Sequence, residues 1–265
     1  MRKALLAATF LCALPAAQPA AAAVFTYIVS GTVAGDASTP GVDQFGQAPV
    51  GRVFSARFEV DDAAPNAVYR EDAGGSSATG GDLLVDGTTP PLTAALTING
   101  ITAKVATGDR EVLPVYYPQI GEYIGPALIE DDGGRIARDA GAGTLSLLAD
   151  YYLFTNCCAP EVSFVTRTRG TLQFTLSGPG FTTPDYRQPG TFAVSGAGSF
   201  LSRYTVLDRS GAGLDDYTAL TFTPTSLQVL GQVPEPRSWA MLILGFGAVG
   251  TALRRARGVA IRQAA

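Results

Sequence analysis

Short runs in which apolar and polar residues alternate make up most of the chain between residues 24 and 232. The run 53–60 is typical, since it places four apolar side chains on one face and Arg57 and Glu59 on the other. Alternation with a period of two, in runs rich in β-branched and aromatic residues, indicates half-buried β-strands. The run therefore predicts a strand whose apolar face packs on a core.

A second signal for β-structure is Asn99-Gly100, which lies between the runs 92–98 and 101–106 and predicts a tight hairpin. Further runs of this kind cover residues 25–33, 144–154, 162–168, 171–176, 191–194, 198–206 and 217–229. No charged amphipathic helix of ten residues appears among them. Many short strands with regular turns predict an all-β domain, an antiparallel β-sandwich or jelly-roll-like ectodomain.

The segments between these runs are rich in glycine, proline and aspartate. Residues 35–49 and 72–82 are expected to form long polar surface loops, because such compositions favour turns over regular structure. Residues 131–134 are expected to form a hairpin turn.

The N-terminus has the three parts of a secretory signal peptide. Arg2 and Lys3 precede an apolar run of eleven residues, and small residues lead to Ala21-Ala22-Ala23. Ala21 and Ala23 form an A-x-A cleavage site, so residues 1–23 are predicted to be removed on export.

The C-terminus carries a second apolar segment. Residues 239–253 are uncharged and are followed by Arg254, Arg255 and Arg257. A helix over 238–253 would span roughly 24 Å, against about 30 Å of hydrocarbon in a bilayer, and is therefore short for a permanent transmembrane helix. The arginines favour a cytoplasmic tail at residues 258–265, with the ectodomain, residues 24–232, on the other side of the inner membrane.

Residues 233–257 resemble the PEP-CTERM sorting domain, in the PEPxxWA form known from alphaproteobacteria. The resemblance is carried by Pro234, Glu235, Pro236, Trp239, Gly245, Gly247, Gly250, Arg254 and Arg255. It implies that a membrane-embedded exosortase recognises the segment, acts near the Pro-Glu-Pro, and releases or re-anchors the protein at the surface. Proteins with this domain are often found in bacteria that make exopolysaccharide.

Charge and composition limit the chemistry of the ectodomain. Residues 24–232 hold 12 Lys and Arg against 22 Asp and Glu, a net charge of −10, which argues against nucleic acid as a partner. The chain contains no histidine, which excludes a Ser-His-Asp triad, a Cys-His pair and the usual zinc ligand sets. A pair of carboxylates, as in glycosidases, stays open as an alternative, with Glu59 and Glu161 as its candidates.

Two further features carry alternative interpretations. Cys157-Cys158 are the only cysteines left after signal cleavage, and in an oxidising compartment they are expected to form a vicinal disulfide in a turn, an intermolecular link or a metal-binding pair. The first of these is favoured. Clustered carboxylates at Glu130-Asp131-Asp132, Asp61-Asp62 and Asp215-Asp216 are either calcium ligands or turn caps. No cofactor and no defined metal site are predicted.

Together these features predict an exported protein, transiently anchored in the inner membrane and then placed at the cell surface or in the extracellular matrix. Exosortase is its expected processing partner, and an extracellular polysaccharide is a candidate ligand. The expected role is non-catalytic, structural or glycan-binding. The alternative is a carboxylate-based carbohydrate-active enzyme on the same β-sandwich scaffold.

Overall fold

The computed structural model describes residues 24–231, apart from residues 43, 47, 82–88, 107–110, 118–121, 160–161 and 208–212. For residues 111–117, 122–131, 155–159, 162–165 and 207 it describes the backbone only. The chain divides into two compact units, residues 1–230 and residues 231–265, and the described strands all belong to the first. Within the described ranges, no helix is long and apolar enough to cross a membrane. The predicted signal peptide and the predicted C-terminal helix lie outside the described residues.

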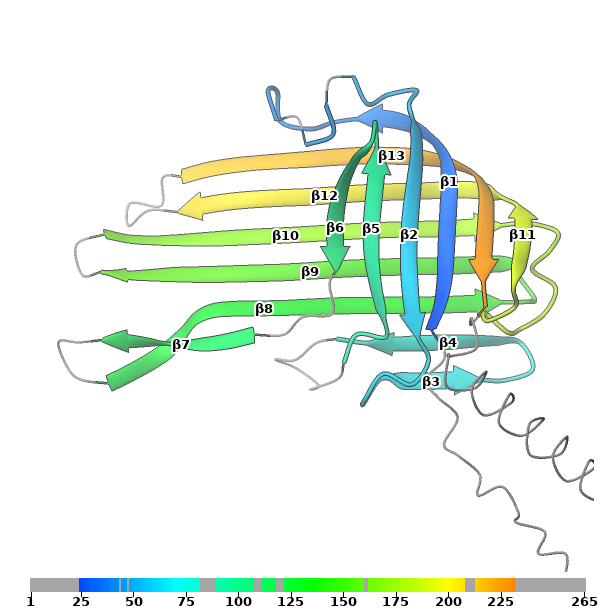
Figure 1. The fold of residues 1–265 in the computed structure, drawn as a ribbon, viewed down its shortest axis with the longest axis horizontal. Coiled ribbons are helices and arrows are strands. Elements are labelled where there is room, and N and C mark those ends of the chain that lie inside the picture. The colour runs from blue at the N-terminus through cyan, green and yellow to red at the C-terminus, as the bar shows by residue number, and fades with distance from the viewer. Residues whose placement is uncertain are drawn as a thin grey trace, which may run out of the picture. The chain divides into compact units, whose positions relative to one another are not determined.

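The described part of the first unit is an antiparallel sheet without helices, which confirms the predicted all-β class (Figure 1). Its strands are β1 (Val24–Asp36), β2 (Val53–Asp61), β3 (Val68–Glu71), β4 (Gly75–Gly80), β5 (Leu92–Ile98), β6 (Ile101–Ala106), β7 (Glu111–Tyr117), β8 (Glu122–Asp139), β9 (Thr144–Ala159), β10 (Val162–Ser177), β11 (Gly190–Ala193), β12 (Ser195–Leu207) and β13 (Gly213–Leu230).

The two layers of the domain belong to one continuous sheet. The strand order is β3-β4-β8-β9-β10-β12-β13-β1-β2-β5-β6, with β11 paired to β13 and β7 paired to β8. Strands β8, β9, β10 and β12 form one layer, and β1, β2, β5 and β6 run across it as the second layer (Figure 1). The sheet therefore curls over its own core. The sequence predicted two layers, but it did not show that β13 joins them.

A bulge in β13 lies where the sheet turns from one layer to the other. The register between β1 and β13 shifts after Ser30, which leaves Thr225 as an extra residue next to Pro224. The Val194 N–H, between β11 and β12, donates to the Thr225 carbonyl at 3.1 Å. A bulge bends a strand and increases its twist, and such bends let one strand serve two crossed layers. Pro224 fits there because a proline inside a sheet is restricted to bulges and edges.

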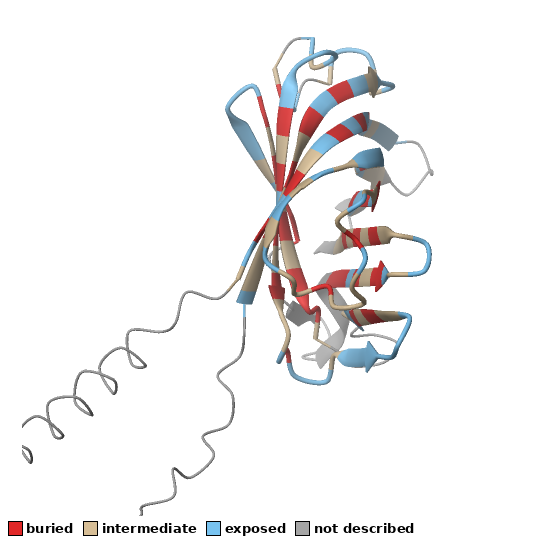
Figure 2. Cartoon of the chain, turned by 90° about the vertical axis from the view of Figure 1, so that its right-hand side faces the viewer, coloured by how far each residue is buried: buried red, intermediate tan, exposed pale blue. Residues whose placement is uncertain are grey.

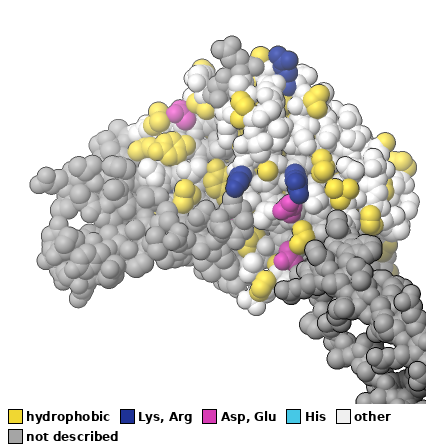
Figure 3. All heavy atoms as spheres, in the orientation of Figure 1, with side chains coloured by type: hydrophobic (Ala, Val, Ile, Leu, Met, Phe, Trp, Pro, Cys, Tyr) yellow, Lys and Arg dark blue, Asp and Glu magenta, His cyan; other side chains and the backbone are white. Residues whose placement is uncertain are grey.

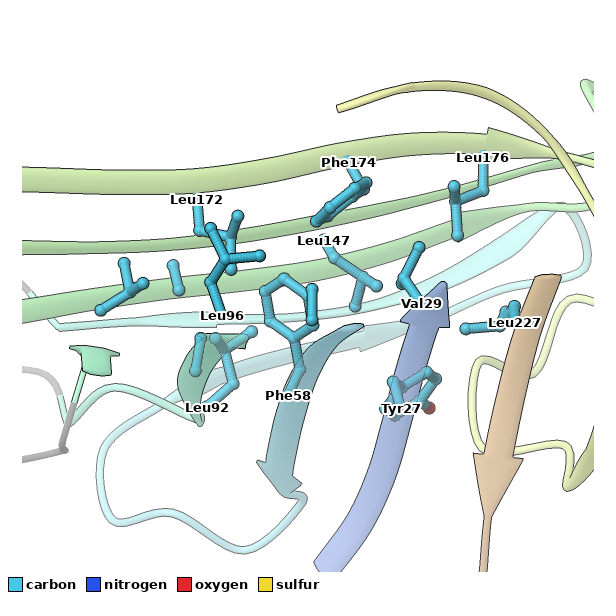
Figure 4. Close-up of a cluster of buried hydrophobic side chains, with 14 of the residues drawn as sticks. Tyr27, Val29, Phe58, Leu92, Leu96, Leu147, Leu172, Phe174, Leu176 and Leu227 are labelled. Atoms are coloured by element: carbon cyan, nitrogen blue, oxygen red, sulfur yellow. The ribbon is translucent and has the colours of Figure 1, made fainter. Parts of the chain in front are cut away.

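The core lies between the two layers and is built from the alternate positions that the sequence marks as apolar. In the second layer these include Tyr27, Val29, Phe58 and Leu96, and the last three point toward side chains of β9 and β10 (Figure 4). Phe54 stacks on Phe174 at a ring distance of 5.6 Å, and both rings contact Phe222. Figure 2 shows the resulting alternation of buried and more exposed positions along the strands. The predicted burial of one face of residues 53–60 is confirmed.

The hairpin at Asn99-Gly100 is confirmed, since both residues have positive φ angles, 54° and 79°. The hairpin turn expected at 131–134 is wrong, because β8 runs through these residues without interruption. Gly133 and Gly134 serve close packing instead: a Cβ on Gly134 would lie 2.7 Å from Leu92 Cγ. The surface loop expected at 72–82 is also wrong, because Gly75–Gly80 forms β4 between β3 and β8.

Candidate functional site

The chain enters and leaves the domain at the same end of the sheet. Val24 begins β1 directly after the predicted signal peptide, and Leu230 ends β13 shortly before the Pro-Glu-Pro. β1 and β13 are antiparallel neighbours, with Thr26 opposite Leu230. Both segments that the sequence assigns to export are therefore attached to adjacent strand ends. From Leu230 to Pro234 an extended chain spans at most about 14 Å.

A loop at residues 178–189, between β10 and β11, packs on the sheet through buried polar groups. The Tyr27 hydroxyl donates to the carbonyl of Tyr186, and the Ser76 hydroxyl donates to the carbonyl of Pro184 at 2.6 Å. The Tyr186 N–H donates to Ser76 Oγ at 2.9 Å. Because Tyr27, Ser76 and Tyr186 are all buried, these bonds fix the 178–189 loop as part of the fold.

Arg138 holds the same loop from β8. Its side chain is 3% exposed, donates to the Gly180 carbonyl at 3.0 Å and to Gln188 Oε1 at 3.2 Å, and lies 5.0 Å from the centre of the Phe181 ring. Burial lowers the pKa of Arg138 from its usual value. Its Nε finds no hydrogen-bond partner among the described residues. This arginine is occupied by the loop and is not placed to act on a ligand.

Arg187, at the outer side of the loop, gathers three carboxylates. Its guanidinium lies 2.7 Å from Glu71, 3.0 Å from Asp185 and 3.7 Å from Asp62. Asp62 is one of the residues considered for calcium, and here it belongs to an arginine-centred cluster. Burial works against the charged form, but the hydrogen bond and charge of Asp185 raise the pKa of Arg187 overall, so its guanidinium stays charged.

The other acidic pairs considered for calcium are dispersed over the sheet. Asp61 Oδ1 accepts the Ala63 N–H at 2.9 Å, which makes it a turn cap, and Asp132 is buried in β8. Asp215 pairs with Arg203, whose hydrogen bond lowers the pKa of this carboxyl. Among the residues that the structure describes, no three histidine, cysteine, aspartate or glutamate side chains come together as a metal site. The structure describes only the backbone of Glu130 and Asp131.

Glu59, a candidate for carboxylate chemistry, lies on the outer face of β2. It accepts a hydrogen bond from Arg57 at 2.6 Å, and the two side chains border a shallow hollow of about 280 Å³ that Thr93 and Lys104 also line. Figure 3 shows this face of the molecule, on which charged side chains are few. Glu161 lies outside the described residues, so the carboxylate pair stays a prediction.

Cys157 and Cys158 lie in strand β9, where their backbone pairs with Phe164 and Ser163 of β10. The expectation that they sit in a turn is therefore wrong, because the strand continues to Ala159. The structure describes only the backbone of these two residues, so the disulfide stays a prediction.

The sequence did not single out a group of side chains on the outer face of the long strands. Tyr152, Arg169, Arg203 and Tyr217 stand directly opposite one another across β9, β10, β12 and β13, and we call them the arginine–tyrosine row. They alternate with inward residues such as Leu172 and Phe200, so they face outward. The sequence contains one indication of this group, the two arginines of Arg167-Thr168-Arg169. The surface itself forms only when four strands pair.

The comparison with family models adds the decisive observation for the C-terminus. The model of the PEP-CTERM protein-sorting motif matches residues 232–257. The chain carries a PEP-CTERM sorting motif. Comparisons with curated proteins and with solved structures give no match for the chain.

The PEP-CTERM motif makes exosortase the processing partner of this protein and implies export to the cell surface. The match confirms the predicted sorting segment, while the alphaproteobacterial PEPxxWA form stays a prediction. The individual motif residues, from Pro234 to Arg255, lie outside the described residues. The roles assigned to them in sorting, like the cleavage site at Ala21 and Ala23, also stay predictions.

Proposed function

We propose that residues 24–232 form a non-catalytic surface domain that binds extracellular polysaccharide after transient anchoring in the inner membrane. The observation that carries the proposal is the position of the two chain ends. Because Thr26 and Leu230 are paired neighbours, the export segments leave from one end of the sheet. Both export segments are thus attached to one edge of the domain, at the paired ends of β1 and β13.

A structural or binding role is supported by what the described surface offers. Among the side chains that the structure describes, Glu59 is engaged in an ion pair with Arg57, and Arg138 holds the fold. The long strands instead present a broad, open face. Such a surface suits an extended polymer better than a small substrate that must be enclosed.

The proposal is tested in the native host with an epitope inserted before Val233 and a second tag after Arg262. The first tag is expected on a product outside the inner membrane that co-purifies with surface polysaccharide, and the second on a separate small fragment or on none. Replacing Pro234 and Glu235 with alanine should leave full-length protein in the inner membrane. Wild-type protein that keeps both tags on one inner-membrane species, with exosortase present, would contradict the sorting step.

The alternative enzymatic role is tested with the same preparation. The exported protein should release no sugar from the polysaccharide with which it co-purifies. Sugar release that is abolished by Glu59→Gln or Glu161→Gln would establish the carbohydrate-active enzyme instead.

A further inference from the structure

We propose that the arginine–tyrosine row is the binding surface for an acidic polysaccharide, whose carboxylates pair with the arginines and whose sugar rings stack on the tyrosines. The inference rests on the proposed function and specifies its ligand. The row lies on the outer face of the long strands, which extend beyond the second layer (Figure 1). There, even inward-facing side chains are open to solvent: Tyr204 is 42% exposed and Leu214 51%.

The geometry of the row fits a linear polymer. Its four members lie on successive strands, so neighbouring strands separate them by about 4.8 Å and the whole row spans about 14 Å. Tyr217 at one end is 38% exposed, and the Arg203 side chain within the row is 54% exposed. The row crosses the strands, and its next position, on β8, is Asp131, which pairs with Tyr152.

The charges of the row are arranged unfavourably for the isolated protein. Arg169 lies directly opposite Arg203, and like charges in that relation destabilise a sheet. Asp215 offsets the charge of Arg203 through a two-point contact, with Arg203 Nε 2.7 Å from Asp215 Oδ1. Among the side chains that the structure describes, Arg169 has no ion-pair partner. A bound carboxylate would relieve the repulsion, since guanidinium groups take carboxylates in two-point contacts.

Beside the row, an aromatic and a cationic side chain, Phe154 and Arg167, provide further contacts for sugar rings. Arg167 stands two residues from Arg169 on the same face and lies 5.9 Å from the centre of the Phe154 ring. Tyr152 is in the adjacent position of the row, so the two aromatic rings belong to the same face of β9. Aromatic side chains present an apolar body with a polar tip, which matches the alternating C–H and hydroxyl edges of a sugar.

A nucleic acid is the less suitable anion. DNA carries one charge per about 1.7 Å of duplex and binds where many cations neutralise many phosphates. The ectodomain has a net charge of −10, and Asp215 stands beside the row. A uronic-acid polymer carries fewer charges per length and has sugar rings available for stacking, so it meets less repulsion from the rest of the domain.

The test uses the exported protein purified from its host and three polymers: polygalacturonate, neutral dextran and single-stranded DNA. We expect binding to polygalacturonate that weakens as salt is raised, and weaker or no binding to the other two. Arg169→Gln should weaken binding to polygalacturonate about tenfold, the equivalent of one charge-assisted hydrogen bond. The matched control, Arg52→Gln, removes the same charge from an exposed position outside the row and should leave binding unchanged.

Two readouts separate binding from folding. Arg169→Gln removes a like-charge contact, so its Tm should equal or exceed that of the wild type. Tyr217→Ala, at an exposed position, should weaken binding at unchanged Tm. Equal effects of Arg169→Gln and Arg52→Gln, tighter binding of DNA than of polygalacturonate, or no binding of polygalacturonate would overturn the inference. Dextran binding that no row variant changes would overturn it and still leave the proposed glycan role standing.

Discussion

At the scale of single residues, the buried phenols of Tyr27, which contacts the 178–189 loop, and of Tyr186, within that loop, tie their ionisation to folding. Burial raises the pKa of Tyr186 to about 12, and it raises the pKa of Tyr27 further, because a phenolate there would lose its hydration. The unfolded chain titrates both phenols near their usual pKa of about 10. Stability from these groups is therefore complete below pH 10 and falls as pH rises, because the unfolded state then loses protons that the folded state keeps.

This predicts alkaline unfolding that depends on the buried phenols. The free energy of unfolding of the exported protein should fall between about pH 10 and pH 12, as followed by denaturant titration at each pH. Tyr186→Phe should reduce that fall, since phenylalanine cannot ionise. The control Tyr217→Phe, at an exposed tyrosine, should retain it. An identical alkaline loss in both variants would show that Tyr186 is not held as a buried phenol.

At the scale of elements, the sequence predicted most strands but not how they are joined. Alternation and the Asn99-Gly100 pair are local signals, and they correctly placed strands such as β2, β5 and β6. Gly133-Gly134 misled, because glycines that allow close packing and glycines that form turns look alike in one sequence. Pro224, in the middle of a predicted strand, was an unused signal for the bulge at which the sheet changes layer.

Gly31, opposite that bulge, should tolerate no side chain. A Cβ there would lie 2.1 Å from the Thr223 carbonyl oxygen, which belongs to the backbone of β13 and cannot move away cheaply. We expect Gly31→Ala to lower the free energy of unfolding by about 3 kcal/mol. The control Gly141→Ala, in the turn between β8 and β9, meets only an ordinary contact at 3.4 Å and should change stability little. Equal stabilities of the two variants in denaturant titrations would contradict the proposed corner.

At the scale of the whole molecule, local sequence motifs revealed the sorting segment, whereas the binding surface depends on strand pairing. Pro234-Glu235-Pro236 is contiguous, and the family match confirms the sorting segment without help from the fold. The arginine–tyrosine row combines residues that lie up to 65 positions apart, from Tyr152 to Tyr217, and depends on the register of four strands. A single sequence does not specify that register. Alternation predicts which face of the sheet each residue occupies, but not which residue of the next strand lies opposite it.

The sorting segment should contribute nothing to the stability of the domain that it exports. β13 ends at Leu230, and its last residues pair with β1 on one side and β11 on the other, so the sheet is complete before the Pro-Glu-Pro. A chain that stops after Gln232 should therefore match the processed wild-type protein in free energy of unfolding to within about 0.5 kcal/mol, the range of surface changes.

A chain that stops after Ser226 should not fold. It lacks Leu227 and Val229, which are 0% and 2% exposed and each contribute about 1.5–3 kcal/mol by burial, and it also loses strand pairing on both sides of β13. That loss approaches the 5–15 kcal/mol by which a typical domain is stable. Circular dichroism and denaturant titration of both secreted products compare the two truncations. Loss of β-structure already in the chain ending at Gln232 would show that the sorting segment is part of the fold, and would move the domain boundary beyond residue 232.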